Sequence, residues 1–196
     1  MEYVWIAIGL ALIVWLVIIY NKLVSYKTQY ENAFAQIDVQ LKRRLDLIPN
    51  LVEVARKYMQ HERETLLAVT QARSGMSQAL SAAEKAPGSA DAMKQLMAAE
   101  SALRGAMARF NIRVEAYPDL KASANMKQLT EELVTTENRI AYARQGYNDL
   151  VQKYNEYRRS FPVVVVASLF GHGQDAALLE FAESREALNE VPQVKF

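Results

Sequence analysis

The regular spacing of apolar residues is the strongest constraint on how this chain can fold. Between residues 126 and 157, apolar side chains recur at alternating intervals of three and four without a slip. This period matches one face of an α-helix that packs in a left-handed bundle. The residues on that face are Met126, Leu129, Leu133, Thr136, Ile140, Ala143, Tyr147, Leu150, Tyr154 and Tyr157. We therefore expect a long helix that is buried along one side.

Two earlier segments, residues 34–80 and residues 93–117, carry the same spacing. Turn signals separate the segments, because "PG" follows the first and "YPDLKASAN" follows the second. Long helices that each have one apolar face must pack antiparallel to bury those faces. The sequence thus predicts an all-α protein: an elongated, antiparallel, up-and-down helical bundle of three long, coiled-coil-like helices.

Pro49 lies in the middle of the first segment. A proline inside a helix removes one backbone hydrogen bond and clashes with the carbonyl group four residues earlier, here that of Leu45. The apolar spacing nevertheless keeps its phase across Pro49. We therefore expect a kink near residues 45–48 and a helix that continues to about residue 85. The alternative is a true break, with Asp46 capping a new helix and Pro49 in its first turn.

The chain opens with an uninterrupted apolar run, "YVWIAIGLALIVWLVIIY" over residues 3–20, which has no charged side chain. As a helix this run is about 27 Å long, close to the thickness of the hydrocarbon core of a bilayer. A cleaved signal peptide fits less well, because a basic start and a small-residue cleavage site are both missing. A buried core helix also fits such a run poorly. We expect a transmembrane helix, and Lys22 and Lys27 just after it favour a cytoplasmic location for the rest of the chain.

After the third helix, "FPVVVVASLF" over residues 161–170 is too short to span a bilayer. A strand, a short helix and a segment at the membrane surface are all compatible with it. We expect a short helix that stops at Gly171 and packs on the end of the bundle, because nothing else in the chain offers a partner strand. The segment "LLEFAESREAL", residues 178–188, is expected to add a turn or two of helix before an extended tail. The expected parts of the chain are a membrane anchor (1–22), a bundle (23–170) and a short C-terminal helix with its tail (171–196).

No pattern in the sequence indicates catalysis, and we assign no catalytic, cofactor-binding or metal-binding residue. The chain has no cysteine, which excludes thiolate metal sites and cysteine nucleophiles. His61 and Glu64 have a spacing that can hold half of a metal site, but a second pair of ligands is missing and a solvated helix face is the simpler interpretation. His172, between two glycines, is expected in a loop. The net charge of +1 gives no indication of nucleic-acid binding.

Some polar residues are expected to contribute to packing. The basic stretch "LKRR", residues 41–44, is expected to pair with Asp38, Asp46 or neighbouring helices, although it could contact anionic lipid. Three polar residues occupy stripe positions, namely Glu62, Glu100 and Thr136. They either form a buried polar layer that sets the helix register or mark places where the bundle is open to water, and we prefer the second interpretation.

A "YN" pair occurs twice in the third helix, at residues 147–148 and 154–155. Buried tyrosines need hydrogen-bond partners, and Asn148 and Asn155 lie seven residues apart on one face, where they can supply them. Aromatic packing in the bundle seam is the simpler interpretation for the four tyrosines, which are Tyr142, Tyr147, Tyr154 and Tyr157.

Two long segments resemble the bacterial LemA family. They are "YNKLVSYKTQYENAFAQIDVQLKRRLDLIPNLVEVARKYMQHERETL" and "NRIAYARQGYNDLVQKYNEYRRSFP", together with the closing "VPQVKF". The resemblance implies a single-pass protein of the bacterial cytoplasmic (inner) membrane, with an N-terminal anchor and an elongated, antiparallel helical bundle. It supplies no catalytic residue.

These observations favour a membrane-anchored scaffold that is not an enzyme and needs no cofactor. Its expected partners are the lipid bilayer and further copies of itself, because long apolar seams promote the lateral packing of copies. The alternative is a monomeric adaptor or regulator of another membrane protein, such as a protease or a kinase.

Overall fold

The computed structural model describes residues 1–181, and every secondary-structure element in that range is helical. The elements are α1 (Glu2–Arg56), α2 (Arg63–Lys85), α3 (Ala90–Glu115), α4 (Pro118–Ala122), α5 (Ala124–Arg159), α6 (Val163–Ala167) and the 3-10 helix η1 (Ser168–Phe170). The all-α fold predicted from the sequence is confirmed.

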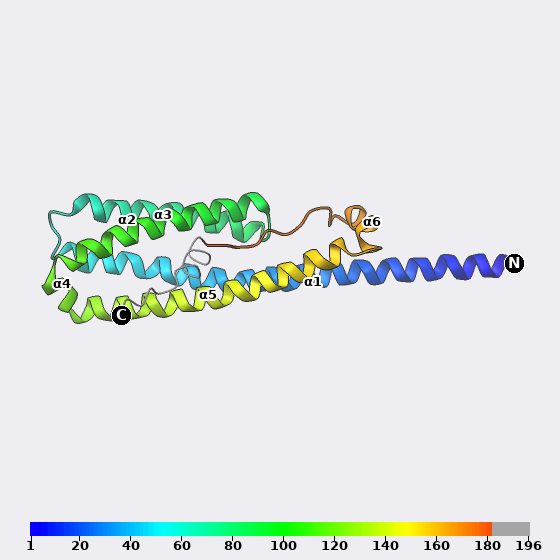
Figure 1. The fold of residues 1–196 in the computed structure, drawn as a ribbon, viewed down its shortest axis with the longest axis horizontal. Helices are drawn as coiled ribbons and strands as arrows, with labels where there is room; N and C mark the ends of the chain where they lie inside the picture. Colours follow the sequence, from blue (N-terminus) through cyan, green and yellow to red (C-terminus); the bar gives the residue numbers. More distant parts are fainter. Residues whose placement is uncertain (182–196) are drawn as a thin grey trace, which may run out of the picture.

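The helices form an elongated antiparallel bundle along α1 (Figure 1). α1 packs against α5 and α2, and α2 packs in turn against α3. The short helix α4 connects α3 to α5 at the end of the bundle opposite the N-terminus, which we call the far end (Figure 1). The other end, next to the projecting start of α1, is the near end. The predicted up-and-down bundle is therefore confirmed.

The bundle contains four long helices, and the prediction of three is wrong. The first helix ends at Arg56 instead of near residue 85, and residues 57–62 form a turn that sends α2 back along α1. Met59 in this turn is fully buried, and its N–H donates to the carbonyl group of Ala55 at 2.8 Å. Because the turn itself buries a stripe residue, the apolar spacing keeps its phase through it. Phase alone therefore does not distinguish a continuous helix from two helices joined by a tight turn.

α1 continues through Pro49, as predicted, and the alternative of a break at Asp46 is wrong. The proline leaves the carbonyl group of Leu45 without its usual partner inside the helix. The Nε–H of Arg73, which comes from α2, donates to this carbonyl oxygen at 2.7 Å. A side chain from the neighbouring helix thus replaces the missing backbone hydrogen bond.

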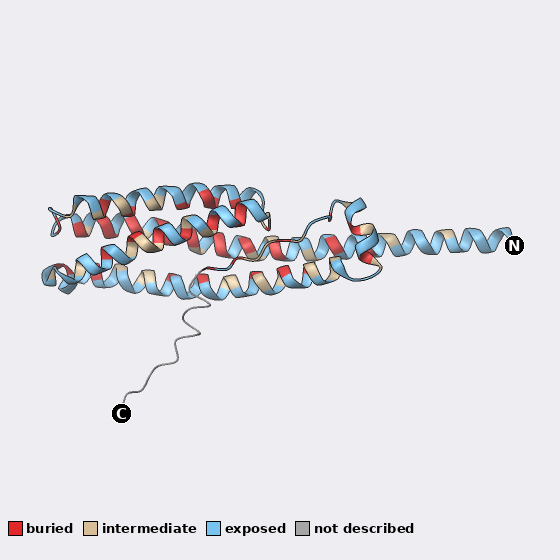
Figure 2. Cartoon of the chain, turned by 45° about the horizontal axis from the view of Figure 1, so that its top comes forward, coloured by how far each residue is buried: buried red, intermediate tan, exposed pale blue. Residues whose placement is uncertain are grey.

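The first third of α1 projects beyond the bundle, and most of its residues are exposed (Figure 2). This apolar part makes α1 a candidate membrane span by length and composition. The helix runs without interruption from the projecting part into the bundle. The boundary that we place at residue 22 lies within α1, and the division into anchor and bundle stays a prediction.

The predicted short helix at residues 161–170 is confirmed as α6 and η1, and Gly171 ends it in the left-handed conformation with φ +76°. This segment packs against α5 and α1 at the near end. The helix predicted over residues 178–188 is wrong for its described part, because residues 178–181 are not helical. The rest of that segment and the closing "VPQVKF" lie outside the described residues.

Candidate functional site

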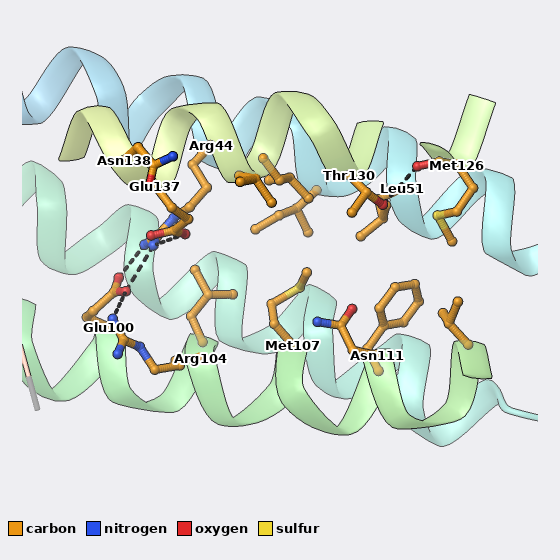
Figure 3. Close-up of a pocket in the computed structure, with 16 residues that line it drawn as sticks. Arg44, Leu51, Glu100, Arg104, Met107, Asn111, Met126, Thr130, Glu137 and Asn138 are labelled. Atoms are coloured by element: carbon orange, nitrogen blue, oxygen red, sulfur yellow. Dashed lines mark hydrogen bonds and ion pairs between the residues drawn. The ribbon is translucent and has the colours of Figure 1, made fainter. Parts of the chain in front are cut away.

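One side of the bundle is open, because α3 and α5 do not pack closely against each other along their lengths. Towards the far end a cleft of about 340 Å³ lies between them, with α1 as its floor (Figure 3). We call it the far cleft. Its lining residues are Arg44, Ile48, Leu51, Glu100, Leu103, Arg104, Met107, Phe110, Asn111, Val114, Met126, Thr130, Leu133, Val134, Glu137 and Asn138.

The walls of the far cleft are mostly apolar stripe residues. Leu103 and Phe110 are buried, whereas Met107 on α3 and Leu133 on α5 are only half-buried. Val134, on the same wall as Leu133, is 55% exposed. An apolar helix face is normally covered by a neighbouring element. The far cleft is therefore a surface on which another apolar element can be buried.

A buried ion-pair cluster closes one end of the far cleft. Arg44 on α1 pairs with Glu100 on α3 through both terminal nitrogens, one of them at 2.9 Å. Its Nη1 also donates to Glu137 on α5 at 2.7 Å (Figure 3). Arg104 contributes a further contact to Glu100 at 3.7 Å. One guanidinium group thus connects the three helices that form the cleft.

The environment keeps Arg44 charged. Burial acts to lower the pKa of its guanidinium group, but the carboxylates of Glu100 and Glu137 outweigh burial and raise that pKa above its ordinary value. Arg44 and Glu100 are both almost fully buried. A buried, hydrogen-bonded ion pair costs much free energy to break from one side, so the cluster holds the spacing of the cleft walls.

The polar stripe positions behave differently from one another. Glu100 belongs to a buried polar layer, so our preference for an opening to water is wrong at this position. Thr136 is also buried, and its hydroxyl group donates to the carbonyl group of Glu132 in its own helix. Glu62 lies in the turn before α2 and contacts Arg113 of α3 at 3.4 Å.

The basic stretch at residues 41–44 pairs within the bundle, as predicted. Lys42 contacts Asp38 at 2.8 Å and Glu84 of α2 at 3.2 Å, and Arg44 reaches α3 and α5 as described above. None of these four acidic partners is Asp46. The stretch therefore connects α1 to every other long helix.

The histidine and glutamate at residues 61 and 64 do not share a helix face. His61 is exposed in the turn between α1 and α2, and only Glu64 belongs to α2. Within residues 1–181, no three His, Cys, Asp or Glu side chains come together in a group that could hold a metal ion.

A second arrangement fills the near half of the gap between α3 and α5. Residues 175–181, which we call the strap, run in an extended conformation along α5 (Figure 1). Asn155 pairs with the backbone of Ala176 through both its amide nitrogen and its amide oxygen, each at 2.9 Å. Asn148 pairs in the same way with Leu179, at 3.1 and 2.8 Å. Each asparagine amide thus donates to the carbonyl group and accepts from the N–H of one strap residue, as a neighbouring β-strand would.

The spacing of the two asparagines matches the strap. Seven residues of α-helix rise about 10.5 Å, and three residues of extended chain rise about 10 Å. Between the two pairs, Ala177 donates its N–H to Gly88 in the turn before α3 and accepts a hydrogen bond from Tyr147. The strap is thereby held by α5 on one side and by the turn before α3 on the other.

The asparagines do not supply the hydrogen-bond partners of the tyrosines, so that possibility is wrong. The simpler interpretation, aromatic packing, is confirmed, because Tyr147 and Tyr154 both pack edge-to-face against Tyr30. The hydroxyl group of Tyr147 donates to the strap at 2.9 Å, and that of Tyr154 lies 2.9 Å from Nδ1 of His172. Tyr157 packs edge-to-face against Tyr26, whereas Tyr142 is exposed. His172 lies after η1, as expected for a loop, but it is buried.

Burial and charge shift the pKa values of the residues that hold the strap. Burial lowers the pKa of His172, and nearby Lys27 lowers it further. Hydrogen bonds from Arg159 and Arg158 lower the pKa of Asp175 at the start of the strap. Burial raises the pKa of Tyr147. These surroundings therefore favour the neutral form of His172 and the ionised form of Asp175.

The repeated "YN" pair is the signal in the sequence that points to the strap. Asparagine has no apolar surface to contribute to a stripe, and two copies at a heptad interval on one helix therefore mark a second bound segment. That segment itself is not recognisable in the sequence, because "DAALLEF" gives no strand alternation of apolar and polar residues.

Comparison with known proteins places this architecture among relatives. A model of the LemA family matches residues 33–196. The curated protein named Protein LemA from Metamycoplasma hominis is 29% identical over 135 residues, which are 69% of this chain and 57% of that protein. The chain thus spans little more than half the length of that relative. Neither comparison names an enzymatic activity, a ligand or a partner.

Proposed function

This chain belongs to the LemA family, and we propose that it is a membrane-anchored, non-catalytic scaffold that self-associates. The observation that carries the proposal is the far cleft, an apolar surface on a bundle whose first helix continues into a candidate membrane span. The bilayer holds the chain, and the far cleft receives another copy of it. No residue in this function has a catalytic or cofactor-binding role.

We propose that two exposed apolar residues of the chain contact the far cleft of a second copy. Leu67 on α2 is 50% exposed and Ile112 on α3 is 71% exposed. Neither residue lines the far cleft, but both belong to the far half of the bundle, near the ends of α2 and α3 that meet α1 and α4. We call these two residues the ridge. The ridge of one copy can therefore meet the cleft of another at the same distance from the anchor.

A shared membrane favours this contact. Anchored copies stand in one orientation on one surface, which raises their effective concentration and matches the heights of ridge and cleft. The net charge of +1 creates little repulsion between copies. A contact between two different surfaces of the same chain is heterologous, so it builds either a closed ring or an open row.

Location is the second part of the proposal. Lys22 and Lys27 follow the candidate span, which supports a bundle on the cytoplasmic side of the bacterial inner membrane. A reporter fused after Phe196 is expected to be active only in the cytoplasm. Reporter activity on the outer side of the membrane would contradict the proposed orientation, but it would not bear on the proposed self-association.

Crosslinking between copies tests the contact. The absence of native cysteine allows single thiols to be introduced without background. One copy carries Asn111→Cys in the far cleft, and a differently tagged copy carries Leu67→Cys in the ridge. Both are expressed in the same membrane and treated with a short bifunctional maleimide. We expect a product that contains both tags.

The matched control replaces Asn111→Cys by Glu131→Cys, an exposed position on α5 that does not line the cleft. This pair is expected to give little mixed product. Equal yields from both pairs, or products that join the cleft thiol only to other proteins, would contradict the proposal. The second result would instead support an adaptor of another membrane protein.

A further inference from the structure

The segment that packs against α1 and α5 at the near end exposes large apolar side chains. It comprises residues 161–170, which we call the collar, and it contains no charged residue. Four of its side chains are exposed, Phe161 at 84%, Val164 at 46%, Val165 at 63% and Leu169 at 81%. Val163 and Ala167 face the bundle and are buried. The collar is thus apolar on both its buried and its exposed side, and the described chain leaves the exposed side uncovered.

The position of the collar on α1 coincides with the end of the apolar anchor. The ring of Phe170 packs edge-to-face against that of Tyr20, with 5.4 Å between the centroids, and Tyr20 is the last residue of the uncharged run. Beyond the collar only the projecting part of α1 continues (Figure 1). The exposed collar therefore lies at the level where α1 would leave the bilayer.

We propose that the collar inserts into the bilayer at the interface between headgroups and acyl chains. The uncharged run of α1 is about 27 Å long, slightly less than the hydrocarbon thickness of about 30 Å. Apolar side chains beside α1 at its exit point supply the missing apolar depth on that side. The exposed collar residues are then covered by lipid instead of water.

The residues around the collar have the chemistry of a membrane interface. The ammonium group of Lys22 lies 4.7 Å from the ring centroid of Tyr157 and 5.8 Å from that of Tyr26. Aromatic rings and basic side chains gather at the interface because one end of each is apolar and the other is polar. This chemistry fits phospholipid better than a protein partner. The inference rests on α1 crossing the bilayer and is independent of self-association.

Depth-dependent quenching tests the proposal on the full chain. Leu169→Cys and Val165→Cys are each labelled with the dye NBD and reconstituted into vesicles of phosphatidylcholine and phosphatidylglycerol. We expect blue-shifted emission at both positions, because an apolar helix face at the interface is buried about 5–10 Å into the headgroup and acyl boundary. Lipids with a nitroxide high on the acyl chain should quench the dye more than lipids with a nitroxide near the chain end.

Gln152→Cys, an exposed position on α5 outside the collar, is the control and should show neither effect. Both labelled collar residues are exposed, so the labels should not disturb folding. Emission at 165 and 169 that matches the control would overturn the proposal. Emission that is blue-shifted but insensitive to nitroxide lipids would also overturn it, because protein would then cover the collar.

Discussion

The two halves of the gap between α3 and α5 differ, although the same two helices form both. In the near half the strap fills the gap, whereas in the far half no segment of residues 1–181 fills it and the gap is a cleft. The residues of α5 at heptad intervals explain the difference. Asn155 and Asn148 each offer an amide group to an extended backbone, but one and two heptads earlier Ala141 and Val134 offer none. Side chains at a single helical position thus decide which half binds a segment of its own chain.

The largest expected effect concerns the charged end of the open half. Arg44→Met leaves the carboxylate of Glu100 buried with only Arg104 nearby. We expect a loss of about 3 kcal/mol in the free energy of unfolding, because an unpaired buried charge is costly. Urea denaturation in detergent, followed by circular dichroism, measures the loss.

Two further variants sharpen that result. Arg43→Met removes the exposed neighbouring arginine and should change stability by less than about 0.5 kcal/mol. The double variant Arg44→Met and Glu100→Met should be more stable than Arg44→Met alone, because the carboxylate of Glu100 is then no longer left buried without Arg44. If the double variant loses as much free energy of unfolding as Arg44→Met and Glu100→Met lose together, the two residues do not act as a pair.

The second expected effect concerns Pro49, which lies outside the far cleft, in a groove of α1 that Arg73 of α2 also lines. Arg73→Ala leaves the carbonyl group of Leu45 without a donor and should cost about 1–3 kcal/mol. In a Pro49→Ala background, the N–H of residue 49 can donate to that carbonyl group, so Arg73→Ala should cost much less. Equal costs of Arg73→Ala in both backgrounds would disprove this link between proline and arginine.

The third prediction concerns the strapped half. Asn148→Ala should accelerate hydrogen exchange at the amide of Leu179, and Asn155→Ala should accelerate it at Ala176. We expect roughly fivefold for each, because the loss of one such hydrogen bond costs about 1 kcal/mol. Asn138→Ala, in the far cleft, is the control and should leave both amides protected. Uniform acceleration across the whole chain would indicate general destabilisation instead.

The smallest expected effect is a weakening of the strap in acid. Because the folded protein lowers the pKa of His172, its contribution to stability is complete above the ordinary histidine pKa of about 6.5 and is lost as the pH falls below it. Asp175 also has a lowered pKa, so its contribution disappears only below about pH 4. The protection factor of the Ala176 amide, which corrects for the pH dependence of the intrinsic exchange rate, should therefore fall in two steps as the pH is lowered, and His172→Gln should remove the first. Protection that increases between pH 7 and pH 5 would contradict this.

Much of the fold could be predicted from the sequence, because it depends on local patterns. The apolar run at residues 3–20 and the spacing across Pro49 follow from the period of the helix, and Gly171 ends a helix for reasons local to its own backbone. The turn at residues 57–62 could not be predicted, because Met59 keeps a stripe position while the chain reverses.

The candidate site was harder to predict, because it depends on partners distant in sequence. Glu100 has the same place in a stripe whether it faces water or a buried arginine 56 residues earlier. Asn148 and Asn155 were recognisable as a pair, but their partners lie in a segment with no strand pattern of its own. The far cleft exists because α3 and α5 do not pack against each other. A repeating apolar stripe shows that a helix face is apolar, but it does not show which other helix will pack on that face.

The number of chains in each membrane particle tests the proposed role of the open half most directly. The full chain is extracted from its membrane in polymer-bounded lipid discs, and the copies in each particle are counted by stepwise photobleaching of a fluorescent tag. We expect several copies for the wild-type chain and one copy for the ridge variant Leu67→Glu with Ile112→Glu, whose exposed positions should not affect folding. A single wild-type copy in every particle would contradict self-association through the far cleft.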